Sequence, residues 1–532
     1  MDTPGTPQAY FALVLHAHLP FVRHPELPRF MEEDWLFEGI TETYLPLLDT
    51  FEGLDRDGVD FRVTMSLTPP LISMLTDELL QERYEQYLDS RIELAGAEMA
   101  RMRGSRELYP LAEMYYDIFT RSRHRFTHEY GRDIVQAFRR LQDKGFLEII
   151  TCGATHGFLP HLKDPVVQRA QIEIAVDQYR EQFGRSPVGI WLPECAYVPG
   201  IEKLLAPFGI RYFLVENHGI LEADSEPTYG VYAPLLTESG VAAFGRDTES
   251  AHQVWSRDSG YPGDYNYREF YRDVGFDLPQ EDVAKYLHSP DIRHMLGIKY
   301  YRITGDTHDK ATYHPGWATD RAAEHAGDFL AKRQEQARRL APLMDRPPMV
   351  VSPYDAELFG HWWYEGPQFL DFLFRKMWHD QDDVAPITPG EYLRRHPVNQ
   401  VATPAMSSWG ANGTFEVWLN GTNDWIYPHL HKAGERMREL ANRYEGASGV
   451  RRRALNQAAR ELLLAQSSDW AFIMTMETTV RYAVRRTKSH LARFTKLYED
   501  ITRDTPDEAW LEEIEKRDNI FPRLQYEVYR DR

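Results

Sequence analysis

Acidic and imidazole side chains follow four apolar runs of the sequence. His16 and His18 follow YFALVL, His156 follows LEIIT, Glu194 follows GIWL, and Asp355 follows MVVS. In parallel α/β folds the carboxyl ends of the strands converge on one site, so these side chains are expected to meet. The i, i+2 spacing of the first two histidines puts them on one face of a strand. That spacing suits two metal ligands, although a lone pair of histidines of this kind more often consists of buried side chains hydrogen-bonded within the core.

Glu194 and Asp355 are the carboxylates of this set. Either one alone could be a helix cap or an ion-pair partner. Together they form the pair that glycosidic bond cleavage needs, one kept protonated by its surroundings and the other ionised. The aromatic content of 13% agrees, because Trp and Tyr rings offer flat apolar faces with polar edges. The sequence therefore predicts carbohydrate chemistry at the strand ends.

The segments that must position these residues alternate between strand and helix. The apolar runs lack alternation, which is typical of parallel strands buried on both faces. An amphipathic helix is expected over residues 165–183, and the strand and helix order predicts βα units in an open sheet or a barrel. Residues 71–144 are helical in pattern with no strand signal, which predicts an insertion. After about residue 404 the pattern is helical to the end of the sequence.

The amino-acid composition argues against nucleic-acid-binding, membrane and disulfide-rich classes of protein. The 532 residues include 61 basic and 81 acidic side chains, a formal net charge of −20, so nucleic acid and membrane surfaces are poor partners. No apolar run approaches the about 18 residues of a membrane span, and no signal peptide pattern precedes the first strand. Two cysteines, Cys152 and Cys195, cannot build a disulfide framework. We expect a cytoplasmic protein without a cofactor, of undetermined oligomeric state.

Six motifs occur in an order and spacing that resembles a known family. HAHLPFV, ATHGFLP, WLPECAY, SPYDAELFGHWWYEG, SSWG and SSDWAF resemble the signature regions of glycoside hydrolase family 57, in particular its 1,4-α-glucan branching enzymes. The resemblance extends over nearly the whole chain. It implies an α/β fold with an incomplete (β/α)7 barrel over residues 1–70 and 145–400, a helical insertion over 71–144, and a C-terminal all-helical domain over 401–532 that covers the cleft.

The resemblance also implies roles for single residues. By match to WLPE, Glu194 is the nucleophile, and by match to SPYD, Asp355 is the general acid and base. His16 and His156 are expected at the sugar under attack, with His18 structural. The substrate would be an α-glucan, cleaved at an α-1,4 bond with retention and transferred to a 6-hydroxyl. Further glucan contacts implied by the motifs are Trp35, Arg246, Trp255, Gly263, Trp409, Trp418 and Asp469.

Tyr229 in the PTYG stretch resembles the tyrosine on a mobile loop that covers the covalent intermediate in branching enzymes. The connections near it are short, which leaves the ratio of transfer to hydrolysis open. The same site could serve an α-1,4-glucan hydrolase or a 4-α-glucanotransferase. A metal-dependent polysaccharide deacetylase is a further alternative, but the motifs supply no third histidine at ligand spacing, so no metal is predicted.

Overall fold

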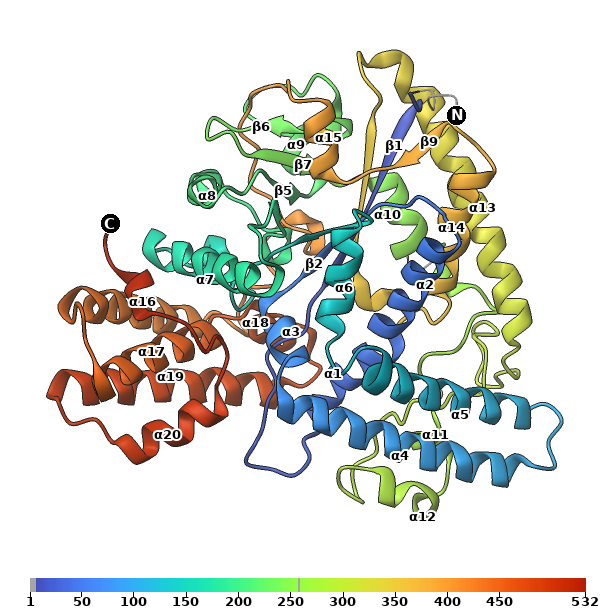
Figure 1. Cartoon of the computed structure of the whole chain (residues 1–532), viewed down its shortest axis with the longest axis horizontal. Coiled ribbons are helices and arrows are strands. Elements are labelled where there is room, and N and C mark those ends of the chain that lie inside the picture. The colour runs from blue at the N-terminus through green and yellow to red at the C-terminus, as the bar shows by residue number, and fades with distance from the viewer. Residues whose placement is uncertain (1–5, 257–258) are drawn as a thin grey trace.

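The computed structural model describes residues 6–256 and 259–532 (Figure 1). Parallel strands form two sheets at its centre, with the orders β3-β2-β1-β8 and β4-β5-β7. Two short strands complete the sheets: β6 lies antiparallel to β7 at the edge of the second sheet, and β9 pairs with the start of β1 inside the first. The strands are β1 (Ala9–Ala17), β2 (Val63–Leu67), β3 (Leu147–Ile150), β4 (Gly189–Ile190), β5 (Tyr212–Val215), β6 (Leu235–Leu236), β7 (Ala242–Gly245), β8 (Met349–Asp355) and β9 (Val384–Pro386).

Two backbone contacts connect the sheets into a ring. Thr151, which follows β3, bridges Ile190 of β4 in parallel register. Asp247, which follows β7, donates its N–H to the carbonyl oxygen of Val351 in β8 at 2.8 Å. The parallel strands therefore follow one another around a barrel in the order β1, β2, β3, β4, β5, β7, β8, without one continuous ladder. The predicted incomplete (β/α)7 barrel is confirmed.

Strand β1 shows how the sequence builds the barrel. All nine of its residues are buried, as an apolar run without alternation predicts. Alternate residues belong to different apolar clusters: Phe11 and Leu13 pack toward the surrounding helices, whereas Ala12 and Val14 share the barrel interior with residues of the other strands. His16 continues this inward row. The period of two thus directs its imidazole into the mouth of the barrel.

Helices surround the barrel and extend from it (Figure 1). The predicted helix over 165–183 is confirmed as α7, whose first turn is capped by the side chain of Asp164 and whose end is set by left-handed Gly184. Helices α4 and α5 run side by side as the insertion, and α13 and α14 pack together beside the barrel. Their bounds are α1 (Asp34–Glu38), α2 (Leu45–Arg56), α3 (Pro69–Leu75), α4 (Glu78–Met102), α5 (Tyr109–His124), α6 (Ile134–Asp143), α7 (Pro165–Phe183), α8 (Ile201–Leu205), α9 (Asn217–Leu221), α10 (Thr248–Trp255), α11 (Val274–Asp277), α12 (Gln280–Val283), α13 (Pro315–Leu340), α14 (Gly366–His379) and α15 (Pro389–Arg395).

The C-terminal part is all helical, as predicted. Helices α17 and α19 pack along each other, and α18 begins directly against the barrel, where the N–H of Ser468 donates to the carbonyl oxygen of His156 at 3.0 Å. The helices are α16 (Ile426–Arg443), α17 (Gly449–Ala465), α18 (Ser468–Met476), α19 (Val480–Arg503) and α20 (Glu508–Arg517). No helix in the described part of the chain has the length and apolar character to cross a membrane.

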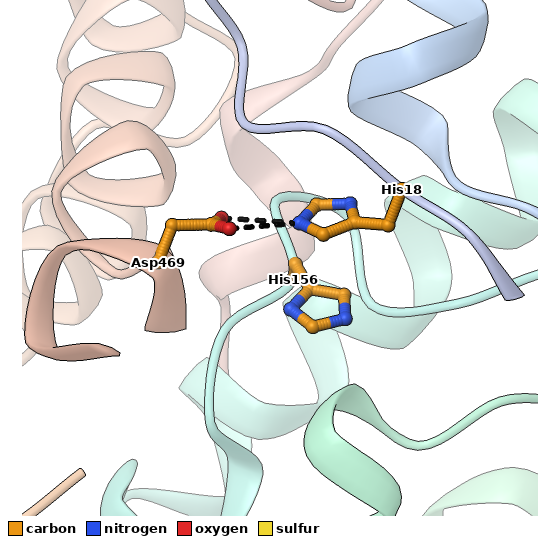
Figure 2. A group of neighbouring side chains, drawn as sticks. All are labelled: His18, His156 and Asp469. Atoms are coloured by element: carbon orange, nitrogen blue, oxygen red, sulfur yellow. Dashed lines mark hydrogen bonds and ion pairs between the residues drawn. The ribbon is translucent and has the colours of Figure 1, made fainter. Parts of the chain in front are cut away.

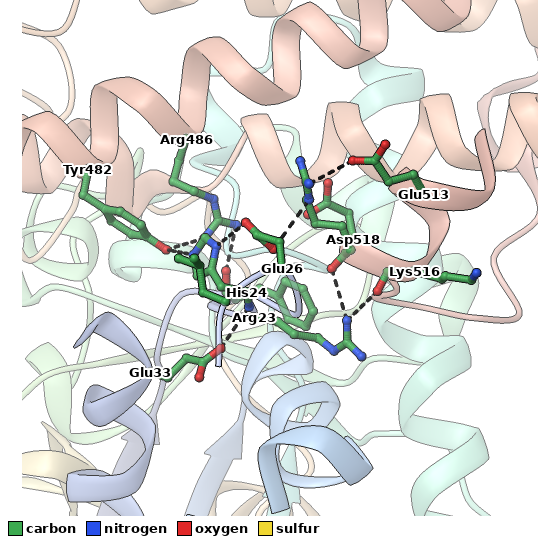
Figure 3. A network of polar contacts seen from close by, with 12 residues as sticks. Arg23, His24, Glu26, Glu33, Tyr482, Arg486, Glu513, Lys516 and Asp518 are labelled. Atoms are coloured by element: carbon green, nitrogen blue, oxygen red, sulfur yellow. Dashed lines mark hydrogen bonds and ion pairs between the residues drawn. The ribbon is translucent and has the colours of Figure 1, made fainter. Parts of the chain in front are cut away.

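Polar contacts hold this helical domain on the segment that follows β1 (Figure 3). The buried guanidinium of Arg486 donates to the hydroxyl of Tyr482 at 2.6 Å and to the carbonyl oxygen of Phe21 at 2.8 Å. His24 lies 3.0 Å from the same hydroxyl. Arg23 donates to the carbonyl oxygen of Lys516 at the end of α20 at 2.5 Å. Helices α19 and α20 are therefore held against the segment that follows β1.

Candidate active site

A cavity of about 650 Å³ lies at the carboxyl ends of the barrel strands. Its volume falls in the range of about 300–1,000 Å³ that is usual for small-molecule sites. Side chains from the barrel, from the loops above it and from α18 form the wall. The residues predicted from the motifs that line this cavity are His16, Trp35, His156, Glu194, Arg246, Trp255, Asp355, Trp409 and Asp469.

Two of these residues have a backbone conformation that is rare outside glycine. His156 has φ 57° and Glu194 has φ 61°, both in the left-handed region. Such a conformation costs about 1–3 kcal/mol and persists only where the surroundings hold it. Both residues lie in tight turns directly after strands. The turns direct their side chains into the cavity mouth rather than along the next helix.

The carboxylate of Glu194 is held by three donors. Trp409 Nε1 donates to Oε2 at 3.0 Å, while Trp418 Nε1 and Ser468 Oγ donate to Oε1 at 3.2 and 2.7 Å. Burial raises the pKa of Glu194, and the hydrogen bonds from Trp409 and Ser468 act against this rise without cancelling it. The donors fix the direction of the carboxylate and favour its ionised form.

Asp355 is kept protonated by its surroundings. Burial, together with the neighbouring charges of Glu357 and Glu194, raises the pKa of Asp355 to about 8. At neutral pH the acid form therefore dominates. The cavity thus contains one carboxylate held by donors and one carboxylic acid able to give a proton, which is the pair that glycosidic bond cleavage requires.

His16 and His156 connect the strand ends to Glu194. Their Nε2 atoms lie 3.0 Å apart, and His156 Nδ1 lies 2.8 Å from Ser468 Oγ, which in turn donates to Glu194. Burial and the proximity of the other histidines lower the pKa of each imidazole well below its usual value. Both rings are therefore neutral. The chain of contacts fixes their orientation at the floor of the cavity.

His18 forms an ion pair with Asp469 of α18, and Figure 2 shows the carboxylate pointing at the edge of the imidazole. Its Nε2 lies 3.1 Å from Asp469 Oδ2, and its Nδ1 lies 3.0 Å from Thr68 Oγ1. Burial acts to lower the pKa of His18, but the carboxylates of Asp469, Glu194 and Glu357 together outweigh burial and raise it. The reciprocal effect lowers the pKa of Asp469 to about 2. The helical domain thus contributes a charge to the catalytic cavity.

His18, His156 and Asp469 are close enough to be tested as metal ligands, since their ligand atoms lie within 4.8 Å of one another. The two imidazoles, however, are stacked, with centroids 3.8 Å apart and planes at 12° (Figure 2). An ion about 2.0–2.1 Å from a nitrogen of each ring would sit between the planes, far from the lone pairs. The nitrogens also have other partners. The stacked geometry does not suit a cation, and an active site without metal remains our prediction.

Two predicted glucan contacts lie outside the cavity. Trp418 is only 1% exposed and stacks on Phe158 at 4.8 Å, so it lies behind Glu194 and donates to it instead of facing the groove. The prediction of a groove contact was wrong for this residue because its ring is buried against Phe158 and Glu194. Gly263 closes an exposed turn that begins at Tyr261, whose ring packs on His325 of α13. It does not line the cavity.

Tyr229 lies at the opposite end of the barrel, which corrects its predicted role over the intermediate. Its ring lies 5.8 Å from the guanidinium of Arg346, three residues before β8 begins at Met349. Strand β8 has seven residues and thus spans about 20 Å before it delivers Asp355 to the cavity. The PTYG match is too short to indicate which end of the barrel its loop covers.

Tyr229→Ala is accordingly expected to leave the ratio of new α-1,6 linkages to new reducing ends unchanged within about twofold, because the ring is remote from the reacting atoms. Counting both products after incubation with amylose checks this. Trp255→Ala is the comparison, since Trp255 lines the cavity and is 41% exposed. A fall in the ratio for Tyr229→Ala alone would contradict the correction.

Several cavity residues were not singled out as site residues from the sequence. Glu357 lies two residues after Asp355, accepts a hydrogen bond from Tyr44 at 2.5 Å and lines the cavity. Trp362 and His18 also line it, and Ser468 holds Glu194. The i, i+2 period after Asp355 was a signal for Glu357, and the same period from His16 was a signal for His18.

Comparison with known proteins agrees with this fold. The model of glycosyl hydrolase family 57 matches residues 12–405, and that of the C-terminal domain of 1,4-alpha-glucan branching enzymes matches residues 429–529. The chain belongs to glycoside hydrolase family 57. It is 35% identical to a 1,4-alpha-glucan branching enzyme of Thermococcus kodakarensis, over 97% of this chain and 77% of that protein.

Two crystal structures show the likeness in three dimensions. That of the Thermococcus branching enzyme, in complex with glucose, has a TM-score of 0.88 at 34% identity and covers 98% of this chain and 97% of that one. A structure described as an α-amylase from Thermotoga maritima has a TM-score of 0.92 at 46% identity, with 98% and 99% covered. Relatives of both activities thus share this architecture.

Proposed function

We propose that this protein is a 1,4-α-glucan branching enzyme that works with retention through Glu194 and Asp355. The observation that carries the proposal is the pairing of two matched parts, a family 57 barrel and a branching-enzyme C-terminal domain, in one cavity. Helix α18 brings Ser468 to Glu194 and Asp469 to His18, so the second part belongs to the site itself. The curated branching enzyme that the chain resembles over 97% of its length supports the same activity.

In the first half-reaction Glu194 attacks the anomeric carbon of a bound α-1,4-glucan. Asp355 gives its proton to the glycosidic oxygen, so the leaving chain departs with a new 4-hydroxyl and the donor chain becomes esterified to Glu194. In the second, the 6-hydroxyl of an acceptor glucan gives its proton to Asp355 and attacks the same carbon. Glu194 is released, and an α-1,6 branch is formed with the original configuration.

His16 and His156 line the cavity at the proposed reacting position. Their ring nitrogens contact each other, Ser66 and Ser468, so a sugar hydroxyl would have to replace one of these contacts to bind an imidazole. The exposed rings of Trp255 and Trp362 lie at the same cavity and offer flat faces to the flanking sugars. Cys152 and Cys195 are buried free thiols, which supports a reducing compartment. We therefore propose that the enzyme works in the cytoplasm. From its similarity to branching enzymes we propose that it takes part in forming a glycogen-like polymer.

An α-amylase is the competing function, favoured by the Thermotoga structure that is 46% identical. Its first half-reaction would be the same, and water would replace the acceptor hydroxyl in the second. The partition depends on how well the cavity excludes water while a glucan acceptor binds. Phe472 and Ile473 of α18 add apolar surface to the wall, which favours transfer.

Incubation with amylose separates the two functions. New reducing ends count hydrolysis, and new α-1,6 linkages, counted after debranching, measure transfer. We expect the α-1,6 linkages to outnumber the reducing ends. Reducing ends that accumulate without α-1,6 linkages would establish the amylase instead.

A further inference from the structure

A second cavity, of about 390 Å³, lies between α2, the insertion helix α5 and α14. It shares no lining residue with the catalytic cavity. Its volume is within the range of about 300–1,000 Å³ for small-molecule sites. The proposed branching reaction does not use it.

Positive charge gathers around this second cavity although the chain carries a net charge of −20. Five arginines and three carboxylates line it: Arg56, Arg121, Arg125, Arg268 and Arg375, with Glu42, Asp49 and Asp371. A positive local balance on an acidic protein attracts anions to one place. The cavity therefore differs in charge from the molecule that surrounds it.

Arg268 is the buried arginine of this set that lacks a carboxylate partner. It is 4% exposed, and within the described residues no carboxylate oxygen lies within 4.0 Å of its guanidinium. Its Nε has no hydrogen-bond partner there, and its Nη1 is 3.4 Å from the hydroxyl of Tyr115. By contrast, Arg125 pairs with Glu52 at 2.6 Å and Arg375 pairs with Asp371 at 2.9 Å. The ring of Tyr364 lies 4.0 Å from this guanidinium and the charge of Glu42 acts on it, but neither occupies Nε, which remains free to donate to an anionic ligand.

We propose that this cavity binds a small organic anion of about the size of a hexose phosphate, with its oxyanion on Arg268. A guanidinium presents parallel N–H donors that match phosphate and carboxylate oxygens. Ile118 and Phe372 offer apolar surface to the body of the ligand, and Thr50 and Ser122 offer hydroxyls. A sugar bearing an acidic group has both kinds of face.

The second cavity is connected to the catalytic cavity by a π-helical turn, Gly39–Tyr44. Thr41 and Glu42 of this turn line the second cavity, whereas Tyr44 donates to Glu357 in the catalytic cavity at 2.5 Å. Glu42 also lies 2.6 Å from Nδ1 of His361, the neighbour of Trp362. Binding at Arg268 should therefore alter turnover on glucan.

Calorimetric titration of the full chain tests the proposal with glucose 6-phosphate, gluconate, inorganic phosphate and maltose. We expect saturable binding of at least one oxyanion. Maltose is a fragment of the proposed glucan substrate, so any heat it gives belongs to the catalytic cavity and should be the same in wild type and Arg268→Gln. Arg268→Gln should weaken that binding about tenfold or more, as the loss of charge-assisted hydrogen bonds does. Arg103→Gln, at an exposed arginine after α4, is the matched control and should bind like the wild type.

Comparing the titrations identifies which kind of oxyanion the cavity binds. Phosphate binding as tightly as the sugar phosphate would assign the site to free phosphate, and gluconate binding alone would assign it to a carboxylate. Thr50→Phe fills the cavity while Arg268 remains, so it should also abolish binding if Arg268→Gln does not fold. No binding of any oxyanion at millimolar concentration, or equal binding by wild type and both variants, would overturn the proposal. These titrations do not depend on which glucan reaction the enzyme performs.

Discussion

Replacement of Glu194 by Gln is expected to lower kcat on amylose by about 10⁴- to 10⁶-fold, as the loss of a catalytic nucleophile does in other enzymes. The amide cannot form the glycosyl ester through which both half-reactions pass. Substrate contacts from the other cavity residues remain, so KM should change far less than kcat. Initial rates on amylose with the purified variant measure this effect.

Glu148 provides a matched control for this substitution. It is also a carboxylate on a barrel strand, and it accepts hydrogen bonds from Tyr212 at 2.7 Å and from the N–H of Gly390 at 3.0 Å. It lies in β3 before the strand end, away from the cavity. Glu148→Gln should lose stability but keep kcat within about threefold. Near-normal turnover by folded Glu194→Gln would remove Glu194 from the mechanism.

Rescue by azide adds a stereochemical test. With α-maltosyl fluoride, whose leaving group needs no proton, Glu194→Ala opens space for azide beside the anomeric carbon. Direct attack by azide from that side should give the β-azide. A wild-type enzyme that passes through the ester keeps the α-configuration in its products. An α-azide from Glu194→Ala would place the nucleophile elsewhere.

The meeting of His16, His156, Glu194 and Asp355 at the strand ends could be predicted because it depends on local pattern. The choice of a barrel over an open sheet, and the roles expected of Glu194 and Asp355, came from the family resemblance. In β1 the inward-facing residues Tyr10, Ala12 and Val14 alternate with outward-facing ones, and the same alternation places His16 inward. The apolar run MVVS ends three residues before Asp355. Carboxyl ends of parallel strands must converge, so the motifs after them had to meet. No long-range contact was needed for this inference.

The features of the site that the sequence did not predict depend on contacts between distant segments. Ser468 reaches Glu194 across 274 positions of sequence, and His18 meets Asp469 across 451. Trp409 and Trp418 both donate to Glu194, yet Trp409 lines the cavity whereas Trp418 is buried against Phe158. Tyr229 was misplaced because a four-residue match carries no information about its position along the barrel axis. The positions of these side chains depend on burial and on how distant segments pack together, and a local sequence pattern predicts neither.

Asp355→Asn is expected to lower kcat/KM on amylose by about 10²- to 10⁴-fold, the usual contribution of general acid catalysis. The loss should be much smaller on α-maltosyl fluoride, because fluoride leaves without a proton. Deglycosylation still needs a base, so the ester on Glu194 should accumulate and appear as a burst. Azide, which needs no base, should then release an α-azide.

The pH profile gives the second half of this prediction. Asp355 must be protonated in the free enzyme, and its pKa is raised to about 8, so kcat/KM of the wild type should fall as pH rises through about 8. Glu194 must be ionised, and its pKa is also raised, so the acid limb should lie above the usual range for glutamate. Asp355→Asn should lose the limb near pH 8 and keep the acid limb.

The stability of the wild type should also depend on the protonation of Asp355. An unfolded aspartate titrates near pH 3.9, so between that pH and about 8 the folded protein binds the proton that the unfolded chain has released. The free energy of unfolding therefore falls as pH rises across this window, and a buried carboxylate is left uncompensated at its upper end. Asn carries no charge, so the Tm of Asp355→Asn relative to the wild type should increase from pH 5 to pH 9. A difference in Tm that stays constant with pH, or a wild-type rate that does not fall above pH 8, would mean that Asp355 is already ionised and that another group donates the proton.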